Sequence, residues 1–183
     1  GDFQCIDYFY VKEFVMPFIR VAGDMTIALN SGSVNTAAEI EFPKLQEIGG
    51  TLTLGTNRNA NNITFPLLKK ILGSCSVTTY KLKNDIEFTN LESIGTDGAD
   101  AQIKFEIEAT NILCPKLKTI NGKFDIATSS FMFDMEVDKV SYPNVESISE
   151  NLSITCPYSD FGSNGILSID FSGLKSAKGI SIS

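Results

Sequence analysis

Apolar residues recur along this chain in a fixed order of spacings, and the order returns about every 25 residues. In the clearest copy, Phe42 is followed by Leu45 and Ile48, then by Gly50 and an alternating Leu-Thr-Leu stretch. A repeat of this length is typical of solenoids, in which each copy forms one coil that stacks on the preceding coil. The other copies have their bulky first residue at Val15, Phe65, Phe88, Cys114, Tyr142 and Phe171.

The polar residues inside each copy predict strands. Ile40-Glu-Phe42 and Leu52-Thr-Leu54 alternate apolar and polar residues, as a strand with one buried face does. A Pro follows the bulky residue at positions 43, 66, 115 and 143, and a Pro without an N–H ends a strand. We therefore expect two short strands per coil, one on either side of a corner that runs from Pro to Gly. Coils stacked about 4.8 Å apart would align these strands into parallel sheets.

The predicted fold is mainly β: a right-handed parallel β-helix, or leucine-rich-repeat-like solenoid, of about seven short coils. Residues 1–14 precede the first copy and are predicted to form a small N-terminal cap, with a helix around residues 8–14. Residues 15–183 are predicted to form a single domain. The fourth copy carries an insertion at residues 95–100 and resumes its alternation at Ile103.

The repeated phrase Phe-Pro-x-Leu-x-x-Ile-x-Gly-x-Leu-x-Leu, preceded by Ile-x-Phe, resembles the receptor L domain. This leucine-rich-repeat-like module occurs in the extracellular parts of epidermal growth factor and insulin receptors and in related fungal and bacterial surface proteins. Residues 21–30 look like a first repeat of the growth-factor receptor type, although the cysteines of this chain do not follow the receptor pattern. The resemblance implies a solenoid displayed outside the cell that binds protein or glycan without chemistry.

Composition excludes several classes of function. The chain has 183 residues, 43% of them hydrophobic, which suits one well-filled core. Its net charge of -7 argues against nucleic acid as a partner. There is no apolar run of the roughly 20 residues that would span a bilayer. The absence of His removes the usual general base and the usual metal ligand, so we expect no enzyme activity, cofactor or metal. We expect an extracellular or cell-surface protein whose leader or lipid anchor lay upstream of Gly1, a bacterial surface lipoprotein being one candidate.

The four cysteines lack the CxxC spacing of a metal site. Cys75 and Cys114 occupy repeat positions that Leu and Phe hold elsewhere, so we expect buried free thiols there. Cys5 and Cys156 lie in less regular segments, and a disulfide between any pair remains open.

The connections between a Leu-x-Leu strand and the next Ile-x-Phe strand vary in length, so insertions should collect on one edge of the stack. Such an edge is often the binding surface of a solenoid. Aromatic residues outside the repeat positions are the candidate anchors for a protein or glycan ligand. The competing interpretation is that they fold back over the sheets as additional core. These residues are Tyr80, Phe131, Phe133, Tyr158 and Phe161.

Two other functions are compatible with the sequence, a carbohydrate-active enzyme and a structural spacer. Asp134, Glu136 and Asp138 alternate along a predicted strand, where alternate residues lie about 7 Å apart. That separation is compatible with glycoside hydrolysis by a carbohydrate-active β-helix enzyme, and the competing interpretation is a solvated face. Asp97 and Asp100 offer oxygen ligands for calcium but lack the spacing of a recognised loop. A structural spacer is the remaining alternative.

Overall fold

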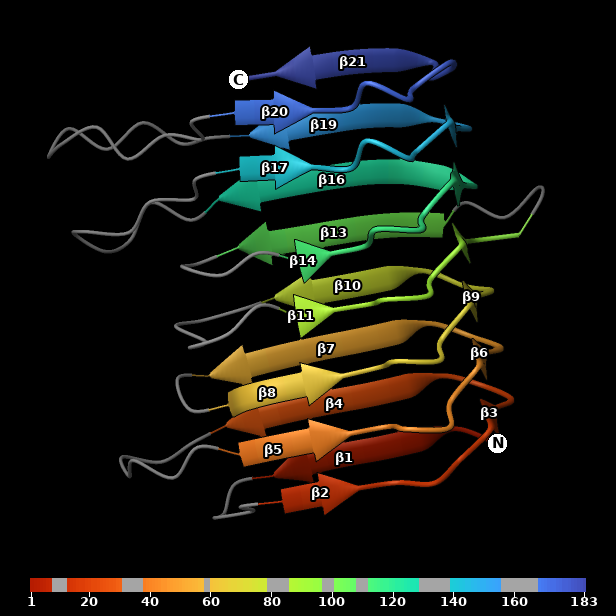
Figure 1. Ribbon diagram of the computed structural model, residues 1–183, viewed down its shortest axis with the longest axis vertical. Coiled ribbons are helices and arrows are strands. Elements are labelled where there is room, and N and C mark those ends of the chain that lie inside the picture. Colours follow the sequence, from red (N-terminus) through yellow and green to blue (C-terminus); the bar gives the residue numbers. More distant parts are fainter. Residues whose placement is uncertain are drawn as a thin grey trace, which may run out of the picture.

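The computed structural model describes residues 1–7, 13–30, 38–57, 60–78, 86–96, 101–107, 112–128, 139–155 and 168–183. Every regular element in these ranges is a β-strand, and every strand pair is parallel. The strands stack into the long, flat-sided solenoid of Figure 1, with β1 and β2 at one end and β21 at the other. The predicted class, a mainly β solenoid of parallel strands, is confirmed.

Sheet A is the longest sheet and contains the Leu-x-Leu strands. Leu52 pairs with Met25 on one side and with Cys75 on the other, so the alternating apolar residues are in register. Ile103 pairs with both Cys75 and Phe124, which confirms that the fourth copy resumes there after its insertion. In order, sheet A consists of β1 (Phe3–Asp7), β4 (Met25–Asn30), β7 (Leu52–Asn57), β10 (Cys75–Thr78), β13 (Ala101–Ile107), β16 (Gly122–Thr128), β19 (Asn151–Thr155) and β21 (Gly179–Ile182).

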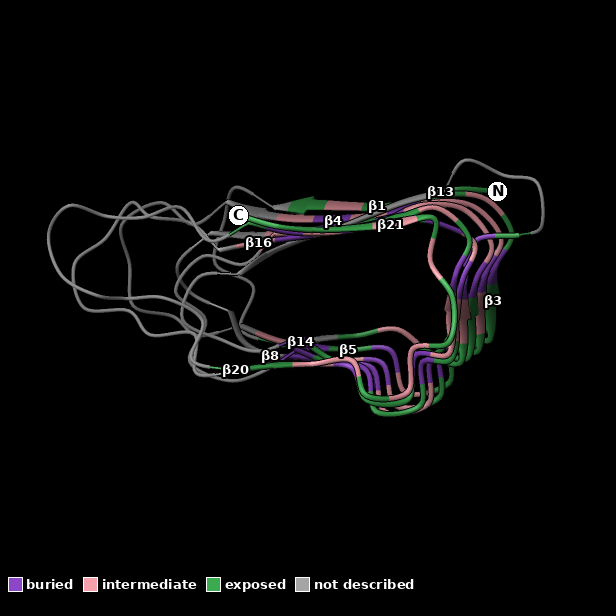
Figure 2. Ribbon diagram, turned by 90° about the horizontal axis from the view of Figure 1, so that it is seen from above, coloured by how far each residue is buried: buried purple, intermediate pink, exposed green. Residues whose placement is uncertain are grey.

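The Ile-x-Phe strands form the facing layer, which is divided into two sheets. Sheet B consists of β2 (Glu13–Val15), β5 (Ala38–Glu41), β8 (Ala60–Thr64), β11 (Ile86–Glu87) and β14 (Ile112–Leu113). Sheet D consists of β17 (Lys139–Ser141) and β20 (Ser168–Asp170). Seen along the stack, sheet A lies opposite sheets B and D, and buried residues line the space between the layers (Figure 2).

The corner of each coil forms a third strand that the sequence analysis missed. Its two residues pair with the coils on either side, as Ile94 does with Ile71 and Ile120. An alternation of two residues is too short to be recognised as a strand from sequence. The seventh corner makes only the isolated bridge from Ser147 to Ser176, so fewer complete turns form than the seven coils predicted. Sheet C consists of β3 (Arg20–Val21), β6 (Glu47–Ile48), β9 (Lys70–Ile71), β12 (Ser93–Ile94), β15 (Thr119–Ile120) and β18 (Ser147–Ile148).

The turn before each corner strand follows from the Pro position. In the third copy the N–H of Leu68 donates to the carbonyl of Phe65 over 3.3 Å, which closes a turn with Pro66 at its second position. Pro is favoured there because its fixed φ matches a type I or II turn. Corresponding bonds join Leu91 to Phe88 (3.2 Å) and Leu117 to Cys114 (3.1 Å), so the corner recurs from coil to coil.

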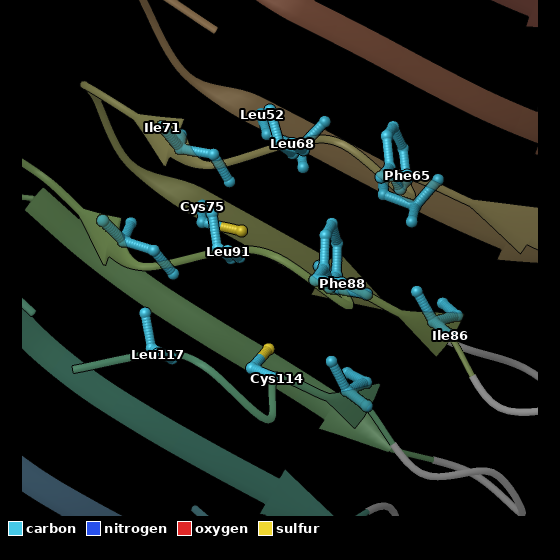
Figure 3. Close-up of a cluster of buried hydrophobic side chains, with 14 of the residues drawn as sticks. Leu52, Phe65, Leu68, Ile71, Cys75, Ile86, Phe88, Leu91, Cys114 and Leu117 are labelled. Carbon is cyan, nitrogen blue, oxygen red and sulfur yellow. The ribbon is translucent and has the colours of Figure 1, made fainter. Parts of the chain in front are cut away.

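The core is a set of ladders, each made of one repeat position. The ladder of leucines predicted at plus three, Leu45, Leu68, Leu91 and Leu117, is fully buried. The rings of Phe42, Phe65 and Phe88 stack face to face, with centroids 5.2 and 5.1 Å apart. Figure 3 shows the Leu and Phe ladders side by side, with Cys75 and Cys114 in the same interior. Each fully buried side chain of this size contributes roughly 1.5 to 3 kcal/mol.

The first copy is offset by one residue from the predicted alignment. Phe14 pairs with Ile40, and Val15 pairs with Glu41, so Met16 lies opposite Phe42. Val15 is accordingly 46% exposed, whereas Met16 packs against the core. A slip of one residue reverses the face of every side chain in a strand, which is why the choice of Val15 was wrong.

The residues predicted as a cap contribute strands to the solenoid sheets. β1 pairs with β4, and β2 pairs with β5, so these are the outermost strands at the N-terminal end of the stack. The helix predicted around residues 8–14 is wrong at Glu13 and Phe14, which begin β2. Residues 8–12 lie outside the described residues.

Candidate binding edge

The C-terminal ends of the sheet A strands lie along one edge of the stack, because parallel strands place like ends together. From this edge the chain passes to the first residue of the next strand of sheet B or sheet D. Figure 2 shows sheet C closing the opposite side, so corners and strand ends lie on separate edges. We call the edge at the strand ends the loop edge; connections leave it from the C-terminal residues of the sheet A strands, Asp7, Asn30, Asn57, Thr78, Ile107, Thr128 and Thr155.

The five aromatic residues predicted as ligand anchors all belong to segments that join strands across the loop edge. Tyr80 lies between β10 and β11, Phe131 and Phe133 between β16 and β17, and Tyr158 and Phe161 between β19 and β20. All five lie outside the described residues. Their role as ligand anchors therefore stays a prediction.

The candidate carboxylates also lie outside the described residues. Asp134, Glu136 and Asp138 precede β17, in the connection that follows β16. Asp97 and Asp100 lie between β12 and β13, where the chain passes from sheet C to sheet A rather than across the loop edge. The insertion begins at Gly95, whose φ of 81° is the left-handed conformation that favours glycine.

Two described residues at the loop edge carry hydroxyl groups. Thr155, at the end of β19, is exposed, and its Oγ1 lies 3.5 Å from the Oγ of Ser183 in the next coil. Thr78, at the end of β10, is half-buried. Among the residues that the structure describes, no cluster of three or more His, Cys, Asp or Glu is arranged to hold a metal ion. Hydroxyl groups such as these can both donate and accept hydrogen bonds to a ligand.

The interior behind the loop edge is chemically inert where it contains thiols. Cys75 and Cys114 are free and buried, which confirms the prediction for both residues. Burial raises the pKa of Cys75 to about 12, and burial and the neighbouring Cys75 raise the pKa of Cys114 well above its ordinary value. Because the thiolate is the nucleophile, these protonated thiols act as small apolar core residues. Cys5 is half-buried, and Cys156 lies outside the described residues.

Tyr142 has a role that the repeat pattern did not reveal. It occupies the position of the stacked phenylalanines, but its hydroxyl donates a 3.0 Å hydrogen bond to the carbonyl of Ile112. Ile112 belongs to β14, the last strand of sheet B, and β17 pairs with β20 instead of β14. The phenol thus supplies a hydrogen bond at the junction between the two sheets. A Tyr in a ladder of Phe was the available signal, since a buried hydroxyl usually has a partner.

A ladder of alternating charges follows the outer surface of the corners. At this repeat position the N–H of each residue donates to the carbonyl one coil before, as Lys118 does to Glu92 over 2.9 Å. Lys175 Nζ lies 2.7 Å from Glu146 Oε2, and this hydrogen bond and the positive charge of Lys175 lower the pKa of Glu146. These side chains are exposed, so each pair contributes little stability. The ladder consists of Gln46, Lys69, Glu92, Lys118, Glu146 and Lys175.

Comparisons with protein-family models, with curated proteins and with solved structures found no match for this chain. In the part of the chain that the structure describes, no helix has the length and apolar character needed to cross a bilayer. The assignment to the parallel β-solenoids therefore rests on the strand pairing described above.

Proposed function

We propose that this chain is a non-enzymatic recognition module, on a cell surface or secreted, that binds protein or glycan through the loop edge. One observation carries the proposal. The connections of unequal length that leave sheet A all begin at one edge, while the opposite side consists of corners of similar form apart from the insertion between β12 and β13. Connections of variable length that collect on one edge of a solenoid are typical of a binding surface.

The scaffold beneath that edge supports the same function. Each described strand of sheet A is held in register by parallel neighbours, and its inward side chains pack in continuous ladders. Strand residues held in this way lose little conformational freedom on binding, which favours affinity. The described interior consists mainly of aliphatic and aromatic side chains and protonated thiols, as suits a support rather than a reaction centre.

The resemblance to the receptor L domain supports the location and the class of ligand in this proposal. The Phe-Pro-x-Leu-x-x-Ile phrase forms the turn and the corner strand of the coil. Its resemblance to L domains supports display outside the cell. Under this proposal the ligand is a protein or an exposed glycan. Tyr80, Phe131, Phe133, Tyr158 and Phe161 provide the contact.

The test is a binding screen of the chain against immobilised glycans and extracellular proteins. It is repeated with alanine at the five aromatic positions. Loss of more than about tenfold in affinity would correspond to anchors worth over about 1.4 kcal/mol in total. Leu67→Ala is the matched control, because Leu67 is 42% exposed at a corner on the opposite side of the stack. Unchanged binding by the five-alanine variant would overturn the proposal, and Asp134→Asn with Glu136→Gln tests any glycan cleavage that the screen detects.

A further inference from the structure

At the C-terminal end of the stack, the last apolar residues of the core ladders are exposed to solvent. Ile180 and Ile182 in β21 are 61% and 60% exposed. Their partners one coil before, Leu152 and Ile154, are only 2% and 1% exposed. The rest of the described chain therefore leaves these side chains of the final coil uncovered. We call its apolar surface the tail end; it consists of Ile169, Phe171, Leu174, Ile180 and Ile182.

The N-terminal end of the stack is open in the same way. Phe18 is 38% exposed, although Leu45, at the same repeat position in the next coil, is fully buried. Phe3 packs edge-on against Phe18 with ring centroids 5.3 Å apart, and both lie at the start of their ladders. We call this surface the head end; it consists of Phe3, Cys5, Met16 and Phe18.

The tail end and the head end are consecutive surfaces of one repeating object. In sheet A the pairing runs from Phe3 through one residue of each successive strand to Ile180 in β21. Phe3 therefore holds the repeat position at the head end that Ile180 holds at the tail end. By the same register, Cys5 corresponds to Ile182. At the corner, the hydrogen bonds that begin at Ile19 and end at Lys175 place these two residues in one column. A head end placed on a tail end would thus continue every ladder with an apolar residue.

Charge favours this polarity over the contact of two like ends. The tail end is bordered by Lys175 and Lys178, whose side chains are 73% and 64% exposed while they pair with Glu146 and Glu150. The head end is bordered by Asp2 and Glu13, which are exposed, and by Arg20, which is bonded to Glu47. By the register of sheet A, Lys178 lies in the column of Gly1, so head on tail brings this lysine next to Asp2, whereas two tail ends in contact would bring four lysines together.

We propose that this chain associates end to end with a second copy of itself, the head end of one copy continuing the sheets at the tail end of the other. Strand β1 of the second copy pairs with β21, which extends sheet A by main-chain hydrogen bonds. The contact joins two different surfaces and does not close on itself, so it generates rods rather than a closed dimer.

Sedimentation velocity of the 183-residue chain across a concentration series tests association, and electron microscopy tests whether the particles lengthen along one axis. We expect a ladder of species that grows with concentration. Ile182→Lys places a charge on the tail end at an exposed position, so it should weaken association more than about tenfold without altering the fold. Leu67→Lys adds the same charge at an exposed corner in mid-stack and should leave association unchanged.

Mixing of variants tests the polarity. Phe18→Lys blocks the head end, and each blocked variant alone should be monomeric, whereas an equimolar mixture with Ile182→Lys should form dimers that grow no further. Ile19→Glu, at a position that is 61% exposed, places an acid opposite Lys175 and should tighten association in a salt-sensitive way. A wild-type chain that stays monomeric throughout, or a Phe18→Lys variant that dimerises by itself, would overturn the proposal. The outcome is separable from the proposed binding function, because none of these positions is among the five aromatic residues assigned to it.

Discussion

Replacing Leu91 with alanine tests the core of the solenoid more directly than any other single change. Leu91 is fully buried, and Leu68 and Leu117, one coil to either side, are fully buried as well. The substitution removes three carbon atoms from the middle of a continuous ladder. No solvent borders this position, so the loss cannot be compensated by water.

The expected cost follows from how little the site can collapse. Leu-to-Ala substitutions in protein cores cost about 2 to 5 kcal/mol, and the largest costs occur where neighbours cannot move into the cavity. Here the corner strand β12 is paired on both sides, through Ser93 with Lys70 and Thr119, so the backbone is held apart. We therefore expect about 3 to 5 kcal/mol, or a melting temperature about 6 to 20 °C lower for a domain of this size.

Thermal unfolding followed by far-UV circular dichroism and calorimetry measures this change. Both signals are needed because a stack of repeats can unfold in parts, and agreement between them shows whether one transition describes the chain. Leu67→Ala is the matched control. Its side chain is 42% exposed one residue before the same ladder, so it should cost no more than about 0.5 kcal/mol. Equal shifts for Leu91→Ala and Leu67→Ala would refute the ladder as the source of stability.

Three further predictions concern other features of the described chain. Gly50→Ala should destabilise the fold by about 1 to 3 kcal/mol in urea unfolding, because its Cβ would lie 2.2 Å from Asp24 Oδ1, whereas Gly55→Ala, with nothing within 4 Å, should be neutral or slightly stabilising. Tyr142→Phe should cost about 1 to 3 kcal/mol at pH 7, since it leaves a buried carbonyl unpaired. Burial holds the pKa of Tyr142 well above 10, so stability should fall as the pH rises past about 10, and part of that fall should vanish in the Phe variant. Cys75 and Cys114 should resist a thiol reagent at pH 8 until denaturant is added, because both are buried. The measurement uses a Cys5→Ser, Cys156→Ser variant, in which only these two thiols can react. Rapid labelling of this variant in its native state would contradict their burial.

Most of the fold could be predicted because the same spacing of apolar residues recurs in several copies along the chain. The ladder from Leu45 to Leu117 is legible as a column of spacings, and a register supported by several copies tolerates an atypical residue such as Cys114. Prediction was wrong where a copy deviates. The first copy has Met16-Pro17 where the others have Phe-Pro or a variant of it, but the neighbouring Val15 fitted the spacing to Phe18 and Val21. The Pro was the better guide, because its turn geometry fixes which residue precedes the corner.

For the candidate site, the sequence could predict which edge of the solenoid carries it but not which side chains contact a ligand. A repeat reveals which residues are shared between coils, whereas binding residues are the ones that are not shared. Tyr80 and Phe131 were selected because they fit no column, and that criterion says nothing about whether a side chain faces a ligand. The junction served by Tyr142 illustrates the same limit, because it depends on β17 pairing with β20 rather than with β14.

The separation of core and connection explains how such a scaffold can vary its binding surface at little cost in stability. Two residues (58–59) lie between β7 and β8, and twelve (156–167) lie between β19 and β20. The strands on either side still pair in parallel: β19 keeps its register with β21, and β8 keeps its register with β5 from Glu39 onwards. Closing a flexible loop costs only about 0.6 kcal/mol more for each doubling of its length. A single buried leucine of the ladder outweighs that cost several times over. Changes at the loop edge and changes in the ladders should therefore have separable effects, on binding and on stability respectively.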